Sequence, residues 1–161
     1  MRRSGTGDTA EWFYEDFAVG RRFDLGETVV DDAEMRDFAQ RFDPQWYHLD
    51  DAAAAEGPFQ KVTASGWYTA SLFMRAYVDV VLSRAAADAS PGVEEMRWLA
   101  AVYAGDRLAG TLTVVDRAPS NSRSGLGTLT LEGVLRCPER DVDVLRIRFR
   151  GWFAMREPDR A

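Results

Sequence analysis

Asp43 and His48 lie five positions apart in a short segment that also contains Pro44. A carboxylate and an imidazole can act together as general base and general acid when they hold one water molecule between them. His48 is the only histidine of the chain, and the imidazole of histidine ordinarily changes its charge near neutral pH. The pair is therefore the first candidate for catalysis, although a lone Asp and His in a loop are more often surface or hydrogen-bonding residues.

Other catalytic chemistries have little support in the sequence. Ser65 is better interpreted as a helix N-cap than as a nucleophile, because no second histidine is present to activate it. The sequence shows no zinc-ligand spacing, no phosphate-binding glycine loop and no Gly-x-Ser-x-Gly motif. Cys137 is the only cysteine, so an intrachain disulfide cannot form.

A helix must bring Asp43 into position, and its two ends are marked in the sequence. Asp31 is a good N-cap, and Glu34 follows three residues later, close to a capping box. Apolar residues then recur at helical spacing, at Met35, Phe38, Ala39 and Phe42. Because Pro44 ends the helix, Asp43 is expected at its C-terminal end.

Two further helical segments follow the pair. A short alanine-rich turn of helix is expected after Asp50, which can cap it, and this turn ends near Gly57. A long helix is then predicted from Gly66 to Ala86, with Ser65 as its cap. Its apolar side chains go nearly all round, a pattern typical of a buried helix.

The apolar pattern changes to a period of two after the long helix, which indicates strands. With an early strand or two, the predicted strand regions are 17–28, 94–102, 108–114, 128–135 and 145–150. Val142 and Val144 have the opposite parity to Leu145, and a bulge near Val144 explains this change. Consecutive strands joined by short turns imply antiparallel pairing, so we predict an α+β fold in which the sheet wraps the long helix.

Length and composition place limits on the rest of the molecule. The 161 residues suit a single domain over residues 11–161, with an irregular N-terminus over residues 1–10. The net charge of -6 argues against nucleic acid or an anionic membrane as partner. The longest apolar stretch contains Arg75, Asp79 and Arg84, which argues against a membrane span. No secretory signal is visible, so a cytoplasmic location is expected.

Four segments carry a resemblance to a known family. Residues 42–50, with the sequence FDPQWYHLD, resemble the signature of MaoC-like (R)-specific enoyl-CoA hydratases. Residues 63–67 resemble the turn into the central helix of that family, residues 97–106 resemble a third block, and residues 120–124 resemble the loop before the next strand. The four blocks occur in family order and span nearly the whole chain.

This resemblance implies a hot-dog fold, in which an antiparallel sheet wraps one long central helix, and a homodimer joined edge to edge. It implies the hydration of a trans-2-enoyl-CoA, or of a carrier-protein thioester, to the (R)-3-hydroxyacyl product. Asp43 and His48 are expected to hold the water, and the backbone N–H of Gly66 is expected to hold the thioester oxygen as it gains negative charge. No metal or redox cofactor is implied.

Five further residues are candidates for substrate binding. Ser65, Trp46 and Trp67 lie next to the expected catalytic residues, whereas Lys61 and Arg148 could contact the phosphates of coenzyme A. The family often has prolines at the positions of Trp46 and Ala101. It often has two glycines after Phe59, where Gln60 and Lys61 stand here. If those glycines serve positive backbone φ angles, this loop must differ.

Two alternative functions remain open at this point. A hot-dog thioesterase usually carries an acidic residue on its long helix, and only Asp79 in the middle and Asp88 at the end are available here. That reading leaves Asp43 and His48 without a role. The other alternative is a non-catalytic thioester-binding or heterodimer partner subunit, against which the intact Asp/His pair argues.

Overall fold

The computed structural model describes residues 10–121 and 123–156. The expectation of an irregular N-terminus over residues 1–10 therefore lies outside the described residues, apart from Ala10. Of the described helices, none combines the length and the apolar character needed to cross a membrane.

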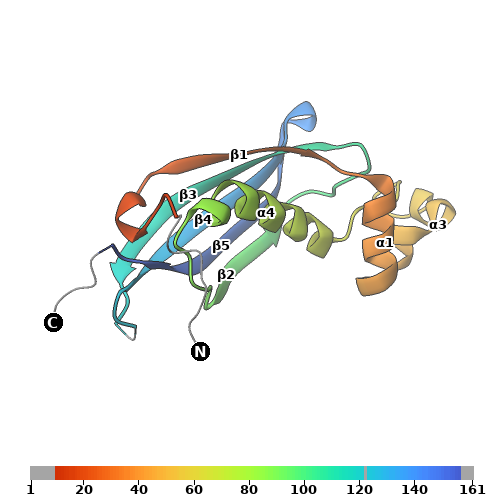
Figure 1. The fold of residues 1–161 in the computed structure, drawn as a ribbon. Coiled ribbons are helices and arrows are strands. Elements are labelled where there is room, and N and C mark those ends of the chain that lie inside the picture. Colours follow the sequence, from red (N-terminus) through yellow and green to blue (C-terminus); the bar gives the residue numbers. More distant parts are fainter. Residues whose placement is uncertain (1–9, 122, 157–161) are drawn as a thin grey trace.

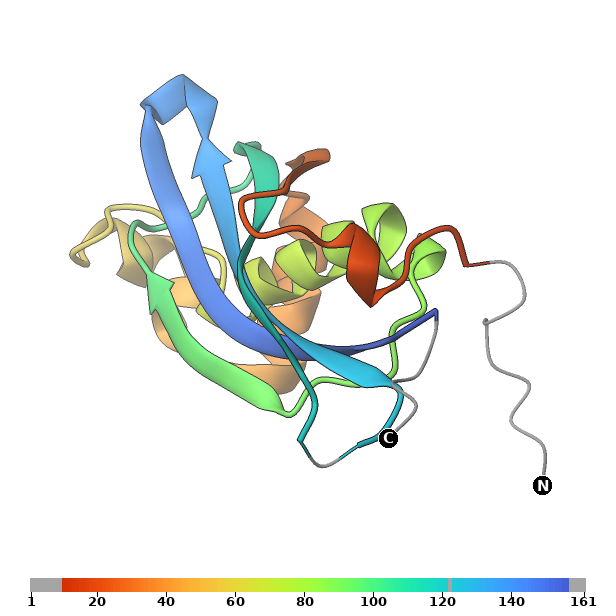
Figure 2. The same ribbon diagram turned by 90° about the vertical axis from the view of Figure 1, so that its left-hand side faces the viewer.

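Five strands form one antiparallel sheet in the order β1-β3-β4-β5-β2. Their bounds are Arg22–Val29 (β1), Gly92–Trp98 (β2), Arg107–Pro119 (β3), Leu126–Cys137 (β4) and Val142–Ala154 (β5). The sheet is curved, and the long helix α4 (Gly66–Val80) lies on its concave face (Figure 1, Figure 2). This arrangement confirms the predicted α+β hot-dog architecture.

The central strands alternate as the period of two predicts. Along β4 every second side chain is buried, and Leu129, Leu131 and Leu135 are among the core residues. In β5 the alternation breaks where Val144 and Leu145, consecutive in sequence, are both fully buried. The register shifts at this point, because Leu135 pairs with Leu145 whereas the next residue of β4 pairs with Asp143. The predicted bulge at Val144 is therefore confirmed.

Helix α4 packs on the sheet through one face only. Its buried side chains are Tyr68, Thr69, Phe73 and Tyr77. Phe73 approaches β4 at Gly133, where a Cβ atom would lie 2.1 Å from the Phe73 ring, so this contact requires a glycine. The predicted burial of this helix against the sheet is confirmed, although its apolar side chains are not covered on every side. Only the sheet side is covered in the described chain, and Trp67, Met74 and Val78 remain exposed.

Two predicted boundaries also require correction. Helix α4 ends at Val80 rather than at Ala86, because the chain turns through the 3-10 helix η3 (Leu82–Arg84) and then pairs with Trp12 and with β5. Strand β2 ends at Trp98 rather than near residue 102. The following residues leave the strand because the Val102 carbonyl accepts a hydrogen bond from Ala64 N, just before α4.

Three shorter helices gather at the N-terminal end of α4 (Figure 1). They are α1 (Asp32–Phe42), α2 (Trp46–Leu49) and α3 (Asp51–Ala55). The predicted caps are confirmed, because Asp31 accepts from Glu34 N at 2.8 Å and Asp50 accepts from Ala53 N at 3.0 Å. The predicted turn after the alanine-rich helix leads directly into the segment before α4.

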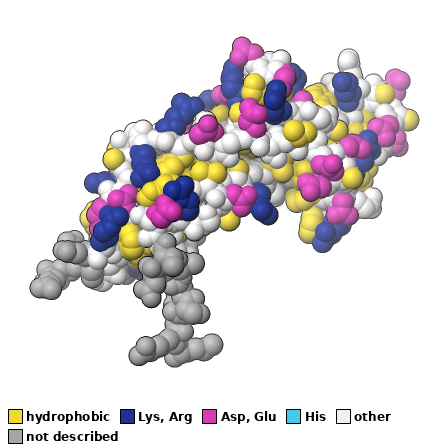
Figure 3. Space-filling model, turned by 45° about the horizontal axis from the view of Figure 1, so that its top comes forward, with side chains coloured by type: hydrophobic (Ala, Val, Ile, Leu, Met, Phe, Trp, Pro, Cys, Tyr) yellow, Lys and Arg dark blue, Asp and Glu magenta, His cyan; other side chains and the backbone are white. Residues whose placement is uncertain are grey.

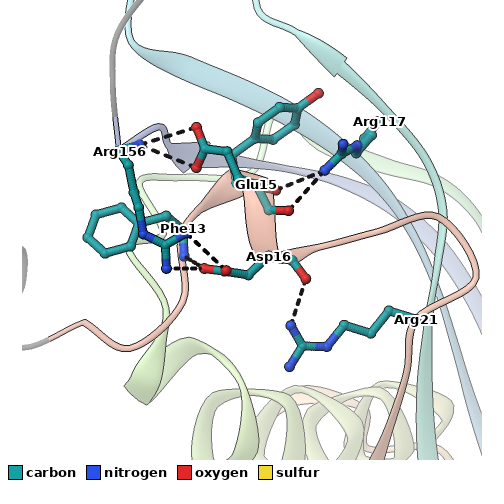
Figure 4. Close-up of polar contacts among 7 residues, drawn as sticks. Phe13, Glu15, Asp16, Arg21, Arg117 and Arg156 are labelled. Atoms are coloured by element: carbon teal, nitrogen blue, oxygen red, sulfur yellow. Dashed lines mark hydrogen bonds and ion pairs between the residues drawn. The ribbon is translucent and has the colours of Figure 1, made fainter.

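A charged cluster lies at the opposite end of α4, around the 3-10 helix η2 (Tyr14–Asp16) (Figure 1, Figure 4). The guanidinium group of Arg156 donates two hydrogen bonds to Asp16, at 2.9 and 2.7 Å. Arg117 and Arg21 donate to backbone carbonyls of the same turn, at 3.2 and 2.7 Å. We call this group, Glu15, Asp16, Arg21, Arg117 and Arg156, the η2 cluster. On the face that Figure 3 shows, acidic and basic side chains are interspersed.

Candidate active site

Asp43 and His48 are positioned by the end of one helix and the beginning of the next. Asp43 is the C-cap of α1, and its N–H donates to Ala39 O at 2.9 Å. Pro44 follows and cannot continue the helix. His48 lies in the single turn α2, and Thr63 N donates to the carbonyl of Tyr47 at 3.0 Å. This bond fixes α2 against the segment that leads into α4.

The two side chains face each other at short range. His48 Nε2 lies 3.3 Å from Asp43 Oδ2. The His48 side chain is 7% exposed and that of Asp43 is 18% exposed. The predicted pair is thus brought together and largely removed from solvent.

The other ring nitrogen of His48 determines which tautomer is present. Nδ1 lies 2.7 Å from the backbone carbonyl oxygen of Thr63, and a carbonyl oxygen can only accept a hydrogen bond. Nδ1 therefore carries a proton, and in the neutral ring Nε2 presents a lone pair toward Asp43. A lone pair and a carboxylate oxygen cannot bond to each other, so a shared proton or a water molecule must join them. This geometry suits a pair that moves a proton.

Asp43 accepts hydrogen bonds from two other side chains. Ser65 Oγ donates to Oδ2 and Gln45 Nε2 donates to Oδ1, each at 2.7 Å. Burial tends to raise the pKa of the Asp43 carboxyl, but these two bonds and the proximity of His48 outweigh it, so the pKa is lowered from its ordinary value. Asp43 is therefore ionised at neutral pH.

The pair opens into a cleft of about 500 Å³, which is within the range typical of small-molecule sites. One wall is formed by the segment after β2, residues 98–102, and another by the first turns of α4. Its lining includes Asp43, Gln45, His48, Phe59, Thr63, Gly66, Trp67 and Trp98. The cleft therefore places the pair beside the N-terminus of α4.

Gly66 is the first residue of α4 and lines the same cleft. Within the described part of the chain its backbone N–H has no acceptor, as is normal for the first turn of a helix. Trp98 lies directly against Gly66, where a Cβ atom would come within 2.5 Å of the indole. Trp98 Nε1 also donates to Gly66 O at 2.7 Å. A glycine at this position thus keeps the first turn open to both Trp98 and a ligand.

The remaining predicted binding residues separate into three groups. Trp67 lines the cleft. Ser65 is fully buried, caps α4 by accepting from Trp67 N at 3.2 Å, and contacts Asp43 rather than the cleft. Trp46 does not line the cleft, because its indole packs against Gly57, where a Cβ atom would lie 2.7 Å from the ring. The structure therefore places this candidate binding residue outside the lining of the cleft.

The two predicted phosphate contacts also differ in position. Lys61 is exposed on the loop between the lining residues Phe59 and Thr63, with Nζ 5.7 Å from the centre of the Tyr103 ring. Arg148 lies on the outer face of β5, away from α4, and its Nε is 3.3 Å from a carboxylate oxygen of Glu94. Lys61 is thus near the cleft, whereas Arg148 does not line it.

The loop before Lys61 adopts positive φ without a glycine. Gln60 has φ 59°, in the left-handed region that side chains other than glycine adopt at some cost. The sequence suggested that this loop must differ from one with glycines here, yet Gln60 itself takes up the left-handed conformation. Gln60 therefore holds a backbone conformation that a glycine would adopt at lower cost.

Three residues of the site were missed from the sequence. Gln45 and Thr63 hold Asp43 and His48, respectively, and Trp98 covers Gly66. Gln45 lay inside the recognised segment, two residues after Asp43, so its position was available as a signal. Thr63 and Trp98 also lay inside recognised blocks, residues 63–67 and 97–106. Their roles were not visible there, because Thr63 acts through a backbone carbonyl and Trp98 contacts Gly66 from a strand distant in sequence.

Comparison with known proteins agrees with this geometry. Residues 16–133 match the family described as MaoC like domain, and this span includes Asp43, His48 and Gly66. The chain belongs to the MaoC-like domain family. A MaoC-like dehydratase from Rhodospirillum rubrum is 34% identical, with a TM-score of 0.82 over 91% of this chain and 99% of that one.

Two further relatives of this MaoC-like protein are more distant. The uncharacterized protein YdeM of Bacillus subtilis is 26% identical over 117 residues, which is 73% of this chain and 83% of that protein. The R-hydratase PhaJ1 from Pseudomonas aeruginosa has the same fold, with a TM-score of 0.68 at 21% identity over 90% of this chain and 86% of that one. Family membership supports a hydratase or dehydratase function in general. Among the described residues, no group of three or more His, Cys, Asp and Glu side chains is arranged to hold a metal ion.

Proposed function

We propose that this protein catalyses the reversible hydration of trans-2-enoyl-CoA thioesters to (R)-3-hydroxyacyl-CoA. The observation that carries the proposal is the 3.3 Å approach of His48 Nε2 to Asp43 Oδ2 in the wall of a cleft that also contains the Gly66 N–H. A base, a charged partner and a backbone donor are thus available at one place.

In the proposed reaction one water molecule lies between Asp43 and His48. Nε2 takes a proton from this water as its oxygen bonds to the β carbon of the enoyl group, and the double-bond electrons move toward the thioester oxygen. The resulting imidazolium, next to the Asp43 carboxylate, then returns the proton to the α carbon on the same face. Atoms balance, since one water is added and both side chains return to their starting states. These proposed reaction steps require no metal or redox cofactor.

The Gly66 N–H is proposed to stabilise the enolate-like intermediate. The N-terminus of α4 adds a partial positive charge at this point. Removal of one such donor in other enzymes has cost about 2.7–4 kcal/mol of transition-state stabilisation. Because the donor belongs to the backbone, its contribution depends on the position of the helix rather than on a side chain.

Lys61 is proposed to contact a phosphate of the substrate near the mouth of the cleft. Within the described part of the chain, no carboxylate lies within ion-pair distance of Lys61. In a chain of net charge -6, a lysine that is not neutralised by a nearby carboxylate is the kind of local charge that a polyanionic thioester needs. Carrier-protein thioesters share this phosphate chemistry.

A homodimer joined through β2 is part of the same proposal. Strand β2 is an edge strand of the sheet, and Val93, Trp98 and Leu99 are exposed along it and just after it. An exposed edge with apolar side chains is a site where a second sheet can pair. Sedimentation of the purified protein, with a dimer expected and a monomer as the contrary result, tests this point.

The structure gives the thioesterase alternative less support than the hydratase. Asp79 is exposed near the C-terminal end of α4 and is paired with Arg75 at 2.7 Å, so it does not face the cleft. Asp88 lies beyond the helix and pairs with Arg123. No acidic residue of α4 therefore lines the cleft in the described chain.

The discriminating experiment is a panel of trans-2-enoyl-CoA substrates. Loss of the enoyl absorbance is followed in parallel with release of free thiol, and the products are analysed for configuration. We expect absorbance loss without thiol release and an (R)-3-hydroxyacyl product. Thiol release would support the thioesterase, and binding without any turnover would support the non-catalytic subunit.

A further inference from the structure

A second cavity lies beside the cleft and shares none of its lining residues. It has a volume of about 310 Å³. Most of its wall is apolar and comes from α4, β2 and β5, including Phe73, Met74, Val93, Ile147 and Phe149. An apolar cavity of this kind can accept a hydrocarbon chain.

Both cavities lie along one groove between α4 and β2. Gly66, Ala70 and Met74 are spaced by four residues, so they share one face of the helix. Gly66 contacts Trp98 at the end of β2, whereas Met74 and Val93, near its start, line the second cavity together. The strand thus runs antiparallel to the helix, and the groove leads from the catalytic pair past Trp98 to the second cavity.

Trp98 is held firmly in the wall of the first cavity. Its indole lies against Gly66, donates a hydrogen bond to Gly66 O at 2.7 Å, and makes an edge-to-face contact with Trp67 at 5.3 Å between ring centres. Trp98 lines the first cavity but not the second. It therefore forms a wall beside the point where the thioester carbonyl is expected to lie.

We propose that Trp98 limits the acyl chain to short lengths by closing the passage from the cleft into the second cavity. This inference rests on the proposed function, because it takes the ligand of the cleft to be an acyl thioester. With Trp98 in place, the acyl group must end within the cleft. Without the indole, a longer chain can extend along the Ala70 and Met74 face of α4.

The test measures the affinity of saturated acyl-CoA thioesters, which bind without turnover. Dissociation constants of butyryl-CoA and dodecanoyl-CoA are measured by calorimetry for the unmutated protein, Trp98→Ala and Trp46→Ala. Because each additional methylene buried in an apolar site increases affinity several-fold, Trp98→Ala should shift the affinity ratio toward dodecanoyl-CoA by at least about tenfold. Trp46→Ala, which removes an indole outside the cleft, should leave the ratio unchanged.

A second variant tests whether a new bulky side chain can replace the indole of Trp98. Adding Ala70→Phe to Trp98→Ala should bring the preference back toward butyryl-CoA. If Trp98→Ala is poorly folded by circular dichroism, Trp98→Leu, which keeps an apolar side chain, takes its place. An unchanged ratio in the folded variant, or equal binding of both thioesters by the unmutated protein, overturns the proposal.

The same proteins separate this inference from the proposed function. Turnover of crotonyl-CoA and dodecenoyl-CoA is assayed alongside binding. Absence of hydration for every substrate, together with the expected shift in binding ratio, overturns the hydratase assignment and leaves the role of Trp98 supported. Hydration together with an unchanged ratio of the two dissociation constants in Trp98→Ala overturns the role of Trp98 and leaves the hydratase assignment supported.

Discussion

At the N-terminal end of α4, a carboxylate and an imidazole are largely buried and face one another across 3.3 Å, whereas at the C-terminal end the charges of the η2 cluster pair at the surface. In the η2 cluster each arginine bonds to a carboxylate or to a backbone carbonyl of the turn. At the other end, His48 Nε2 presents a lone pair to a carboxylate oxygen of Asp43, so the two atoms cannot form a direct hydrogen bond in the neutral ring.

The difference shows what each end can do. Exposed ion pairs such as Arg156 with Asp16 each contribute little to stability, but they can hold a chain segment against the sheet. A largely buried carboxylate beside an imidazole has to offset a desolvation cost, so its burial is weak evidence for a stabilising role. The pair that faces a cleft is therefore the better candidate for chemistry, and the η2 cluster is a structural fastening.

The largest expected effect comes from replacing either member of the pair. Asp43→Asn keeps the size of the side chain but removes its charge, and His48→Gln removes the group that carries the proton. Since positioned acid–base groups contribute about 10²–10⁴-fold, each change should lower kcat on crotonyl-CoA by at least about 10²-fold. Circular dichroism should show an intact fold.

The double variant sharpens this test. If both side chains act on one water, Asp43→Asn combined with His48→Gln should lose little beyond the worse single variant. Losses that multiply would indicate two independent roles, and near-normal activity of a folded His48→Gln protein would refute the assignment.

Ser65→Ala should shift the pH dependence of the reaction. The Ser65 hydrogen bond helps to hold the pKa of Asp43 low against the opposing effect of burial, so its loss should raise this pKa. Because the carboxylate must be ionised and Nε2 of His48 must be free to take a proton, kcat/KM should fall in two stages toward acid. The stage in which Asp43 takes up its proton should begin at higher pH in Ser65→Ala. Loss of the α4 cap should also lower stability by about 1 kcal/mol.

Ser71→Ala is the matched control for this substitution. The Ser71 hydroxyl is exposed on the same helix and bonds only to Trp67 O, at 2.8 Å. It should leave both the pH profile and the melting temperature nearly unchanged. An acid limb that does not move in Ser65→Ala would show that the hydroxyl serves only as a helix cap.

A smaller effect is expected from replacing Lys61, which lies near the cleft. Arg148, on the outer face of β5, provides the comparison. Lys61→Ala should raise KM for acyl-CoA several-fold and reduce its dependence on salt, because surface charge interactions are screened by ions. Arg148→Ala should leave KM unchanged, since Arg148 pairs with Glu94 away from the cleft. A larger effect of Arg148→Ala than of Lys61→Ala would contradict this placement.

The smallest effect is expected in the η2 cluster. The hydrogen bond from Arg156 holds the pKa of Asp16 below its ordinary value, although burial opposes it. The stability from this pair is therefore present above the unfolded pKa of Asp and is lost as pH falls through the lowered value. Arg156→Ala should lower the melting temperature only slightly near neutral pH, and less still in acid, without changing kcat. Thermal melts at several pH values, with activity assays, check both parts.

Much of the fold could be predicted from local patterns. Caps such as Asp31 and Asp50 depend on residues three positions away, and the alternation in β4 depends on which face is covered. The bulge at Val144 was visible because its parity conflicts with that of Leu145. These features are local in sequence, so the sequence contains the information needed to infer them.

The residues of the site could be predicted where they lie in recognised segments, but the contacts between distant segments could not. Asp43 and His48 lie in one segment, whereas Trp98 reaches Gly66 from a distant strand and Thr63 acts through its backbone. The outward position of Arg148 follows from the alternation of β5, in which its neighbours Ile147 and Phe149 are buried. The exposed face of α4 could not be foreseen either, because composition alone does not show which side meets the sheet.

The most direct test of a single water held by Asp43 and His48 is the stereochemistry of hydration in heavy water. Crotonyl-CoA is incubated with the unmutated protein in D₂O, and the 3-hydroxybutyryl product is analysed for configuration at both carbons. The proposed mechanism predicts an (R)-hydroxyl group and an α deuteron on the same face of the former double bond. An (S) product, or a deuteron delivered to the opposite face, would contradict it.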